Sequence, residues 1–171
     1  MARVVKGRHS ADTGDLDEFV VFLIGMRINR LSQVWRWLPV FKAMPRMLTE
    51  LGDDPSLGLL GRPRVFLSGR VIQVQQYWRS FEDLDRYARS ATHAHLPAWR
   101  NFNRVIRDNG TVGVFHETYR VGPGRVEAVY ANMPVFGLAA ATSHVPADRV
   151  GQTAATRIGV RPADAPPVAP Y

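Results

Sequence analysis

Cysteine is absent from this chain of 171 residues. Its absence excludes disulfide bonds, thiolate metal sites and a cysteine nucleophile. Lysine is scarce, since 20 of the 22 basic residues are arginine. The net charge of +7 therefore comes from arginines, which are spread from Arg3 to Arg161 without a dense cluster. Because no zinc-finger, helix-turn-helix or RNA-binding signature accompanies them, we expect no nucleic-acid partner.

Long hydrophobic runs are also missing. The longest, FVVFLIGM at residues 19–26, is far shorter than the roughly 20 residues that a membrane helix needs. The N-terminal stretch MARVVKGRHSADTGDLDE lacks the apolar core of a signal peptide. We therefore expect a soluble, cytoplasmic protein with no membrane partner. Hydrophobic residues make up 46% and charged residues 22%, which are ordinary values for a globular domain with a buried core.

Composition changes along the chain and divides it into three parts. Residues 1–17 are polar and irregular, and we expect a flexible N-terminal arm. Residues 18–145 carry the apolar periodicity of a folded domain. Residues 146–171 are rich in alanine and proline, ending in RPADAPPVAPY, and we expect a disordered tail.

The folded part alternates between strand and helix patterns. The patterns predict a strand at 18–30 and a helix after Ser32 with an apolar face and a kink at Pro45. They then predict one or two strands in 64–78, broken near Ser68–Gly69, and short helices near 81–89 and 97–107. Strands at 111–121 and 125–133 are predicted to pair as a hairpin. This order is typical of an α+β fold, a ferredoxin-like antiparallel sheet with helices on one face. The uncovered face predicts a partner subunit, and hence a homodimer.

Alternation along the strands separates residues by face. In the segment 64–78, one face of the part after Gly69 holds Ile72, Val74, Gln76 and Trp78, with Gln76 as its polar member. One face of the later strand holds Val112, Val114, His116, Thr118 and Arg120. On the first strand, Arg27 and Asn29 share the face of Val21 and Leu23. A tryptophan such as Trp78 is usually core or interface filler because of its large apolar area.

Two histidines, His93 and His95, come just before Leu96–Pro97, where proline favours the first turn of a helix. They are either exposed loop histidines or ligands. A zinc site needs three or four converging ligands, so we expect no metal site. A haem needs one axial histidine over an apolar cavity, so haem stays open. His95 is the better candidate, because it is closer to the helix face that carries Trp99 and Phe102.

Five segments carry a resemblance to a known family: FVVFLIGMRINRLSQVWRWLPVFKAMPRML, VQQYWRSFEDLDRYARS, HAHLPAWRNFN, VFHETYRV and EAVYANMPVFGLAAA. They resemble the monooxygenase-like proteins related to the fumagillin-pathway monooxygenase, within the antibiotic-biosynthesis-monooxygenase superfamily. The resemblance covers roughly Glu18 to Ala141. It implies a dimeric α+β barrel, in which the sheets of two subunits pack face to face.

The resemblance also implies a chemistry. Cofactor-free oxygenases of this superfamily deprotonate an aromatic substrate, whose anion then reacts with dioxygen. A strand asparagine and a cavity tryptophan commonly assist, and Asn29 and Trp78 match those positions. In the haem-degrading branch, a W-x-S pattern precedes an axial histidine. Here Trp78 and Ser80 match the pattern, and His95 lies slightly earlier than the ligand of that branch.

Together these patterns predict a small oxygenase of secondary metabolism that oxidises an apolar or aromatic intermediate with dioxygen and no cofactor. Asn29 and Trp78 are expected to hold substrate and oxygen, and His116 or His95 to act as general base, since the ordinary pKa of histidine suits proton abstraction. The residues expected to contact the substrate are Arg27, Gln76, Trp99 and Phe102. Two alternatives stay open: a haem-dependent enzyme ligated through His95, and a non-catalytic dimer that binds a small molecule.

Overall fold

A computed structural model describes residues 2–90, 92, 100, 102 and 109–160. The chain divides into two compact units. The larger unit is Val20–Arg120, and the smaller combines Met1–Phe19 with Val121–Tyr171. No helix in the described ranges is both long enough and apolar enough to cross a membrane.

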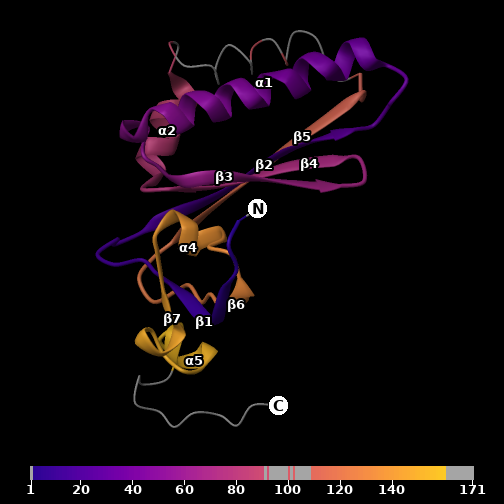
Figure 1. Cartoon of the computed structure of the whole chain (residues 1–171). Helices are drawn as coiled ribbons and strands as arrows, with labels where there is room; N and C mark the ends of the chain where they lie inside the picture. The colour runs from indigo at the N-terminus through magenta and orange to yellow at the C-terminus, as the bar shows by residue number, and fades with distance from the viewer. Residues whose placement is uncertain (1, 91, 93–99, 101, 103–108, 161–171) are drawn as a thin grey trace. The chain divides into compact units, whose positions relative to one another are not determined.

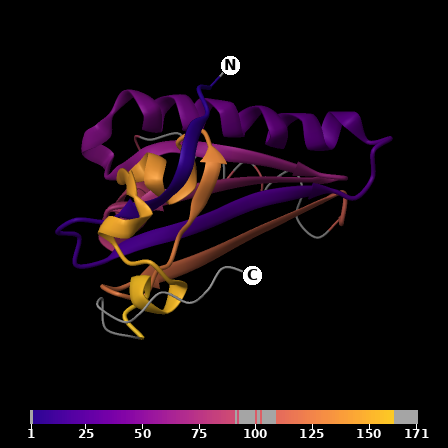
Figure 2. The same ribbon diagram turned by 60° about the horizontal axis from the view of Figure 1, so that its bottom comes forward.

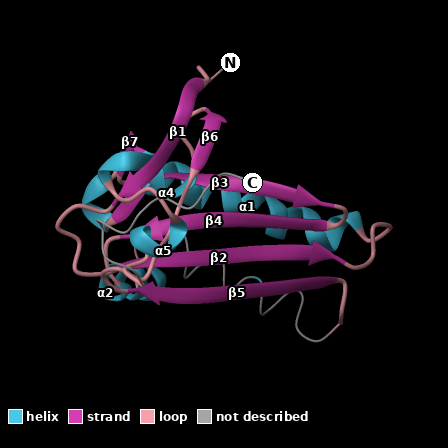
Figure 3. Cartoon of the chain, turned by 90° about the horizontal axis from the view of Figure 1, so that it is seen from below, coloured by secondary structure: helices cyan, strands magenta, loops and turns pink. Residues whose placement is uncertain are grey.

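A four-stranded sheet forms the base of the larger unit. Its strands are β2 (Phe19–Ile28), β3 (Leu59–Ser68), β4 (Val71–Trp78) and β5 (Val112–Val121), in the order β3-β4-β2-β5. Figure 3 shows the four strands side by side. Strand β4 pairs antiparallel with both β2 and β3. This order and the antiparallel pairing confirm the predicted ferredoxin-like α+β fold.

The break predicted near Ser68–Gly69 is the turn between β3 and β4. Gly69 has a φ of 55°, in the left-handed region, which glycine adopts at little cost and which two-residue hairpin turns require. Pairing continues on both sides, with Ser68 opposite Val71 and Leu67 opposite Ile72. The hairpin puts the alternating residues of β4 in the middle of the sheet.

Two helices, α1 (Val34–Asp53) and α2 (Phe81–Arg89), lie on the same side of this sheet (Figure 1). Figure 2 shows the long helix α1 along the strands from a second direction. Helix α1 is unbroken through Pro39 and Pro45, and the 3-10 turn η1 (Pro55–Leu57) follows it. Helix α2 begins where the Ser80 hydroxyl accepts a hydrogen bond from the Asp83 N–H at 3.1 Å. Carboxylates in its first turn and arginines in its last complement the helix dipole.

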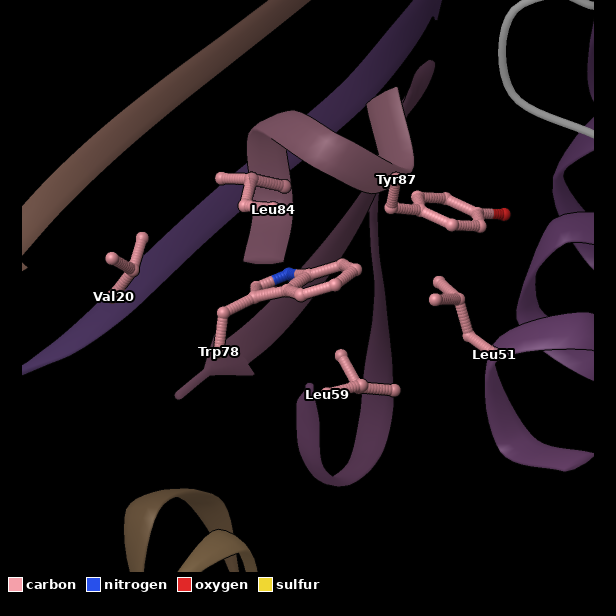
Figure 4. Close-up of a cluster of buried hydrophobic side chains, with 6 residues drawn as sticks. All are labelled: Val20, Leu51, Leu59, Trp78, Leu84 and Tyr87. Carbon is pink, nitrogen blue, oxygen red and sulfur yellow. The ribbon is translucent and has the colours of Figure 1, made fainter. Parts of the chain in front are cut away.

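One end of the larger unit is a packed core. Six buried side chains form it: Val20, Leu51, Leu59, Trp78, Leu84 and Tyr87. Figure 4 shows Trp78 at its centre, between the helix residues and the strand residues. The side chain of Trp78 is 0% exposed. A second cluster of buried side chains lies at the other end of β2 and consists of Met26, Ile28 and Val112.

Two predictions differ from the structure of the smaller unit. The stretch expected as a flexible arm contains β1 (Val5–Asp12), the central strand of a sheet in the order β6-β1-β7. Strand β6 (Tyr130–Met133) pairs with β1, whereas β5 belongs to the other sheet, so the predicted hairpin of these two segments was wrong. Strand β7 (Ser143–Pro146) is the other neighbour of β1.

Part of the expected disordered tail is also folded. Around β7 the smaller unit has three short helices: α4 (Gly137–Ala141), η2 (Ala147–Arg149) and α5 (Ala154–Arg157). Arg157, whose side chain is 5% exposed, fixes α5 through a Glu127 carboxylate oxygen 2.5 Å from its Nη2. Its Nη1 also donates to the Gly151 carbonyl at 3.0 Å. Residues 161–171 lie outside the described ranges. These contacts join distant segments, and so the local composition did not indicate them.

Candidate functional site

The larger unit has a cavity of about 900 Å³ between its sheet and its helices, and this cavity is open to solvent on one side. Alternate residues of the strands form its floor, and the apolar stripe of α1 forms its roof, since helical residues three and four apart share a face. The lining residues include Phe22, Ile24, Met26, Ile72, Val74, Val40, Met44, Met47, Leu48 and Leu84. A cavity of this size and polarity suits a bulky apolar ligand.

Polar side chains are few in this lining, and one of them is His116. It is the only histidine among the described lining residues. Its ring lies against Phe22, with ring centroids 5.9 Å apart and planes tilted by 41°. Thr118 lines the cavity two residues farther along the same strand. Asp85 also reaches the lining, but its carboxylate is paired with Arg89, with Nε and Oδ1 2.7 Å apart. His116 is therefore the described lining group best suited to move a proton.

A second, much smaller void of about 30 Å³ adjoins Trp78 and Gln76. The Trp78 indole N–H donates to the Gln76 Oε1 at 2.9 Å. The Trp78 ring also packs against Tyr87, with centroids 5.7 Å apart. Four residues were predicted to share one face of β4. Of these, Ile72 and Val74 line the large cavity. Gln76 and Trp78 line the small void.

Asn29 and Arg27 lie elsewhere. The Asn29 Nδ2 donates to the Gly110 carbonyl at 3.1 Å, and its Oδ1 accepts a hydrogen bond from Arg27. Neither residue is among the described lining of either void. The reason is the alternation of β2, since Phe22, Ile24 and Met26 face the cavity and residues of the other parity face away. The structure gives Asn29 a place at the end of the sheet, where it holds the turn before β5.

The other predicted site residues divide into two groups. Phe102 lines the large cavity. His93, His95 and Trp99 lie outside the described residues, so their predicted roles stay predictions. In the part of the chain that the structure describes, no three histidine, aspartate or glutamate side chains are grouped as a metal site would require.

Sequence reasoning did not single out Phe22, Met44 and Met47 as cavity residues. Met44 and Met47 were seen as part of an apolar helix face, but that pattern is the same for a closed core and for a cavity wall. Tyr87 was missed as well. Its hydroxyl donates to Glu50 Oε2 at 3.0 Å and so ties α2 to α1. Burial, and then the Glu50 carboxylate, raise the pKa of Tyr87, which keeps this phenol protonated as a donor.

The smaller unit holds a pair of stacked imidazoles. The rings of His9 and His144 have centroids 4.4 Å apart and planes within 12°. Burial, and then the neighbouring His9, lower the pKa of His144 below its ordinary value. The two histidines belong to a different unit from the cavity.

Comparisons with known proteins identify the family of this chain. The sequence model of the family described as Monooxygenase af470-like matches residues 19–138. The chain is similar to Monooxygenase af470 of Aspergillus fumigatus, with 26% identity over 151 residues, which cover 77% of this chain. They cover 53% of that relative, so the chain spans about half its length.

Solved structures share the fold. An aldoxime dehydratase structure is similar with a TM-score of 0.57 and 21% identity, covering 80% of this chain and 43% of that one. SnoaB, a cofactor-independent oxygenase from Streptomyces nogalater, matches with a TM-score of 0.43 and 10% identity over 60% of this chain and 91% of that one. For the dehydratase, this likeness concerns the fold alone.

Proposed function

We propose an oxygenase function for this chain, which belongs to the monooxygenase af470-like family. The substrate is an apolar or aromatic small molecule, and dioxygen reacts with it without a metal, flavin or haem. The observation that carries the proposal is the cavity of about 900 Å³, whose described lining is almost entirely apolar and includes one histidine, His116. A role in secondary metabolism, which the family resemblance implies, and a cytoplasmic location are part of the same proposal.

His116 supplies the base in this proposal. Neutral imidazole takes a proton from a substrate CH₂ group that adjacent aryl or carbonyl groups make acidic. The resulting carbanion gives electrons to dioxygen and forms a C–O bond, yielding a peroxide that takes up the proton. Loss of water then leaves a carbonyl, so that R–CH₂–R′ and O₂ become R–CO–R′ and H₂O. The electrons come from the substrate, and no external reductant is needed.

Haem is the alternative that the sequence left open through His95, which lies outside the described residues. The two propionates of haem are anions, and charge-assisted hydrogen bonds from arginine or lysine would suit them. The described lining of the cavity has neither Arg nor Lys. The described lining residues therefore do not fit haem well, and the proposed reaction uses no haem.

Oxygen uptake tests the proposal directly. We expect the purified protein, in the presence of EDTA and without added haem, to accelerate oxygen uptake by an activated CH₂ compound such as dithranol, with one O₂ consumed per carbonyl formed. Added haemin should leave the rate unchanged and give no sharp shift of its Soret band. A Soret shift that disappears in His95→Ala, together with haem-dependent turnover, would instead support the haem enzyme. Binding of the compound without any acceleration would support the non-catalytic alternative.

The face of the sheet opposite the cavity supports the proposed homodimer. The helices α1 and α2 cover only one face (Figure 1). On the other face, Phe66 is 38% exposed, and Tyr119 is 50% exposed. We propose that this face packs against the same face of a second copy, as in the dimeric α+β barrels that the family resemblance implies, with Phe66 and Tyr119 on its two edge strands.

Sedimentation velocity at micromolar concentration tests the dimer. We expect a dimer for the natural chain and a monomer for Phe66→Glu, since a charge would be buried without a partner in the interface. Leu67→Glu is the matched control. Leu67 is 75% exposed and pairs with Ile72, whose side chain faces the cavity, so this substitution lies on the other face and should leave the dimer intact. A monomeric natural chain, or equal effects of both variants, contradicts the proposal.

A further inference from the structure

The side-chain amide of Gln76 is buried below the large cavity, with Gln76 only 5% exposed. Its Oε1 accepts the hydrogen bond of the Trp78 indole at 2.9 Å. An indole N–H can only donate, so the atom that it contacts must be the amide oxygen. The chemistry of Trp78 thus determines which end of the amide is which, a choice that otherwise has to be inferred from the whole hydrogen-bond network.

The other end of the amide, Nε2, carries two N–H donors. Among the described residues, none accepts a hydrogen bond from it. Nε2 is not among the fully buried side-chain atoms without a partner, so it keeps some accessible surface. Gln76 lines the void of about 30 Å³. The donors of Gln76 therefore face a site that an acceptor oxygen from outside the protein can fill.

The size and walls of the small void indicate what that acceptor is. A void of about 30 Å³ is large enough for a water-sized group, such as one oxygen substituent. Six residues line both the void and the large cavity: Phe22, Ile24, Met44, Met47, Leu84 and Ala88. A molecule in the large cavity can thus place one polar substituent in the void while its carbon skeleton stays in the apolar space.

Gln76 also lies in a row with the proposed base. Phe22 on β2 is directly opposite Gln76 on β4, and the Phe22 ring contacts His116 on β5. The three residues thus cross three neighbouring strands on one face of the sheet. Neighbouring strands are about 4.8 Å apart, so the strands that carry Gln76 and His116 lie about 10 Å apart. A ring system lying over Phe22 reaches both.

We infer that Gln76, held in place by Trp78, is the donor subsite for a carbonyl or hydroxyl oxygen of the ligand in the large cavity. The ligand class is therefore an apolar, ring-containing molecule with a single oxygen substituent directed into the void, and with its acidic C–H group at the His116 end. Trp78 acts as a positioning residue through its bond to Oε1. Only the identification of the ligand as a substrate rests on the proposed function; the subsite itself does not.

A matched pair of probes tests the subsite by binding alone. The bicyclic ketone 1-tetralone and its parent hydrocarbon tetralin differ by one carbonyl oxygen. We expect Gln76→Met, which has a similar shape but no N–H donor, to weaken tetralone binding about tenfold, as loss of a hydrogen bond to a buried carbonyl predicts. Tetralin binding should change by less than about threefold, because it makes no such bond. Calorimetry without dioxygen measures both affinities and avoids turnover.

The carbonyl itself supplies a second readout. In the infrared spectrum of bound ¹³C-labelled tetralone, the C=O stretch should lie at lower frequency in the natural protein than in Gln76→Met, because hydrogen bonding weakens the C=O bond. Gln76→Glu is the second variant, used in case Gln76→Met does not fold. Its carboxylate still accepts from Trp78 but has no donor when ionised, so it should also lose the tetralone preference.

Two outcomes would overturn the inference. The first is equal weakening of tetralone and tetralin in the variants, which would give Gln76 a packing role. The second is an unshifted C=O stretch in the natural protein, which would leave an ordered water as the partner of Nε2. Failure of the proposed oxygenase is distinguishable from both, since it would abolish oxygen uptake while the tetralone preference and the infrared shift remain.

Discussion

Replacing His116 with asparagine should lower the rate of substrate-dependent oxygen uptake by at least about 100-fold, since a positioned general base contributes about 10²–10⁴-fold. Asparagine keeps a polar side chain next to Phe22 but cannot take up a proton. His116 is the only histidine among the described lining residues. The carboxylate of Asp85, which also lines the cavity, is paired with Arg89 and does not replace the lost base. Oxygen-electrode rates at saturating substrate measure the effect.

The control for this variant is Thr118→Val. Thr118 lines the same cavity and lies on the same face of β5 two residues away, but it is not a base at neutral pH. We expect the rate of Thr118→Val to stay within about threefold of the natural rate, and the small variant His116→Ala to recover part of its activity when imidazole is added. Full activity in His116→Asn would mean that the proton goes elsewhere, and His95, the other predicted base, would be the next residue to replace.

The parts of this fold that local patterns specify were predicted correctly. The alternation of β4 predicted one face with Ile72, Val74, Gln76 and Trp78, and these residues do line the two voids. The turn at Gly69 is also a local signal, because a tight turn depends on a few adjacent residues. Such features need no knowledge of the rest of the chain.

The presence and size of the cavity could not be predicted from the sequence. Periodicity says which face of α1 and which face of each strand point inward, but not how far apart the two layers lie. Met44 and Met47 have the same spacing whether they fill a core or border a space of 900 Å³. The separation of layers depends on the sum of many side-chain volumes and contacts, which no single segment contains.

The smaller unit shows the same limit for strand pairing. The sequence of β1, VKGRHSAD, has little apolar periodicity, and its partners β6 and β7 lie more than a hundred residues away. Backbone hydrogen bonds with distant strands make it a strand. Local composition could only describe it as polar, and so the flexible arm and the hairpin of the last two strands were wrong.

Family resemblance and alternation gave different answers for the first strand. The resemblance placed a site role on Asn29, whereas the parity of β2 puts Asn29 and Arg27 on the face away from the cavity. The contacts of Asn29 with Gly110 and Arg27 agree with the parity. For Trp78 the two arguments agree on position, and its role can be separated from its packing by experiment.

Trp78→Ala should lower the free energy of unfolding by about 3–5 kcal/mol, the usual cost of removing a buried aromatic side chain. Trp78 is 0% exposed and packs among Val20, Leu59, Leu84 and Tyr87. Figure 4 shows its indole between these side chains, so its removal leaves a hole that the sheet and α2 cannot close without moving. Urea denaturation followed by circular dichroism measures the loss.

Trp35→Ala is the matched control, because it removes the same side chain from a place where it is 70% exposed. Its effect should stay within about 0.5 kcal/mol, as for most surface substitutions. Trp78→Phe keeps most of the volume and loses only the bond to Gln76, and should cost about 1–2 kcal/mol. If Trp78→Ala is as stable as Trp35→Ala, Trp78 is not a core residue. If Trp78→Phe is stable but loses both oxygen uptake and tetralone preference, the indole acts by holding Gln76 toward the ligand, and the predicted direct role in oxygen activation is not needed.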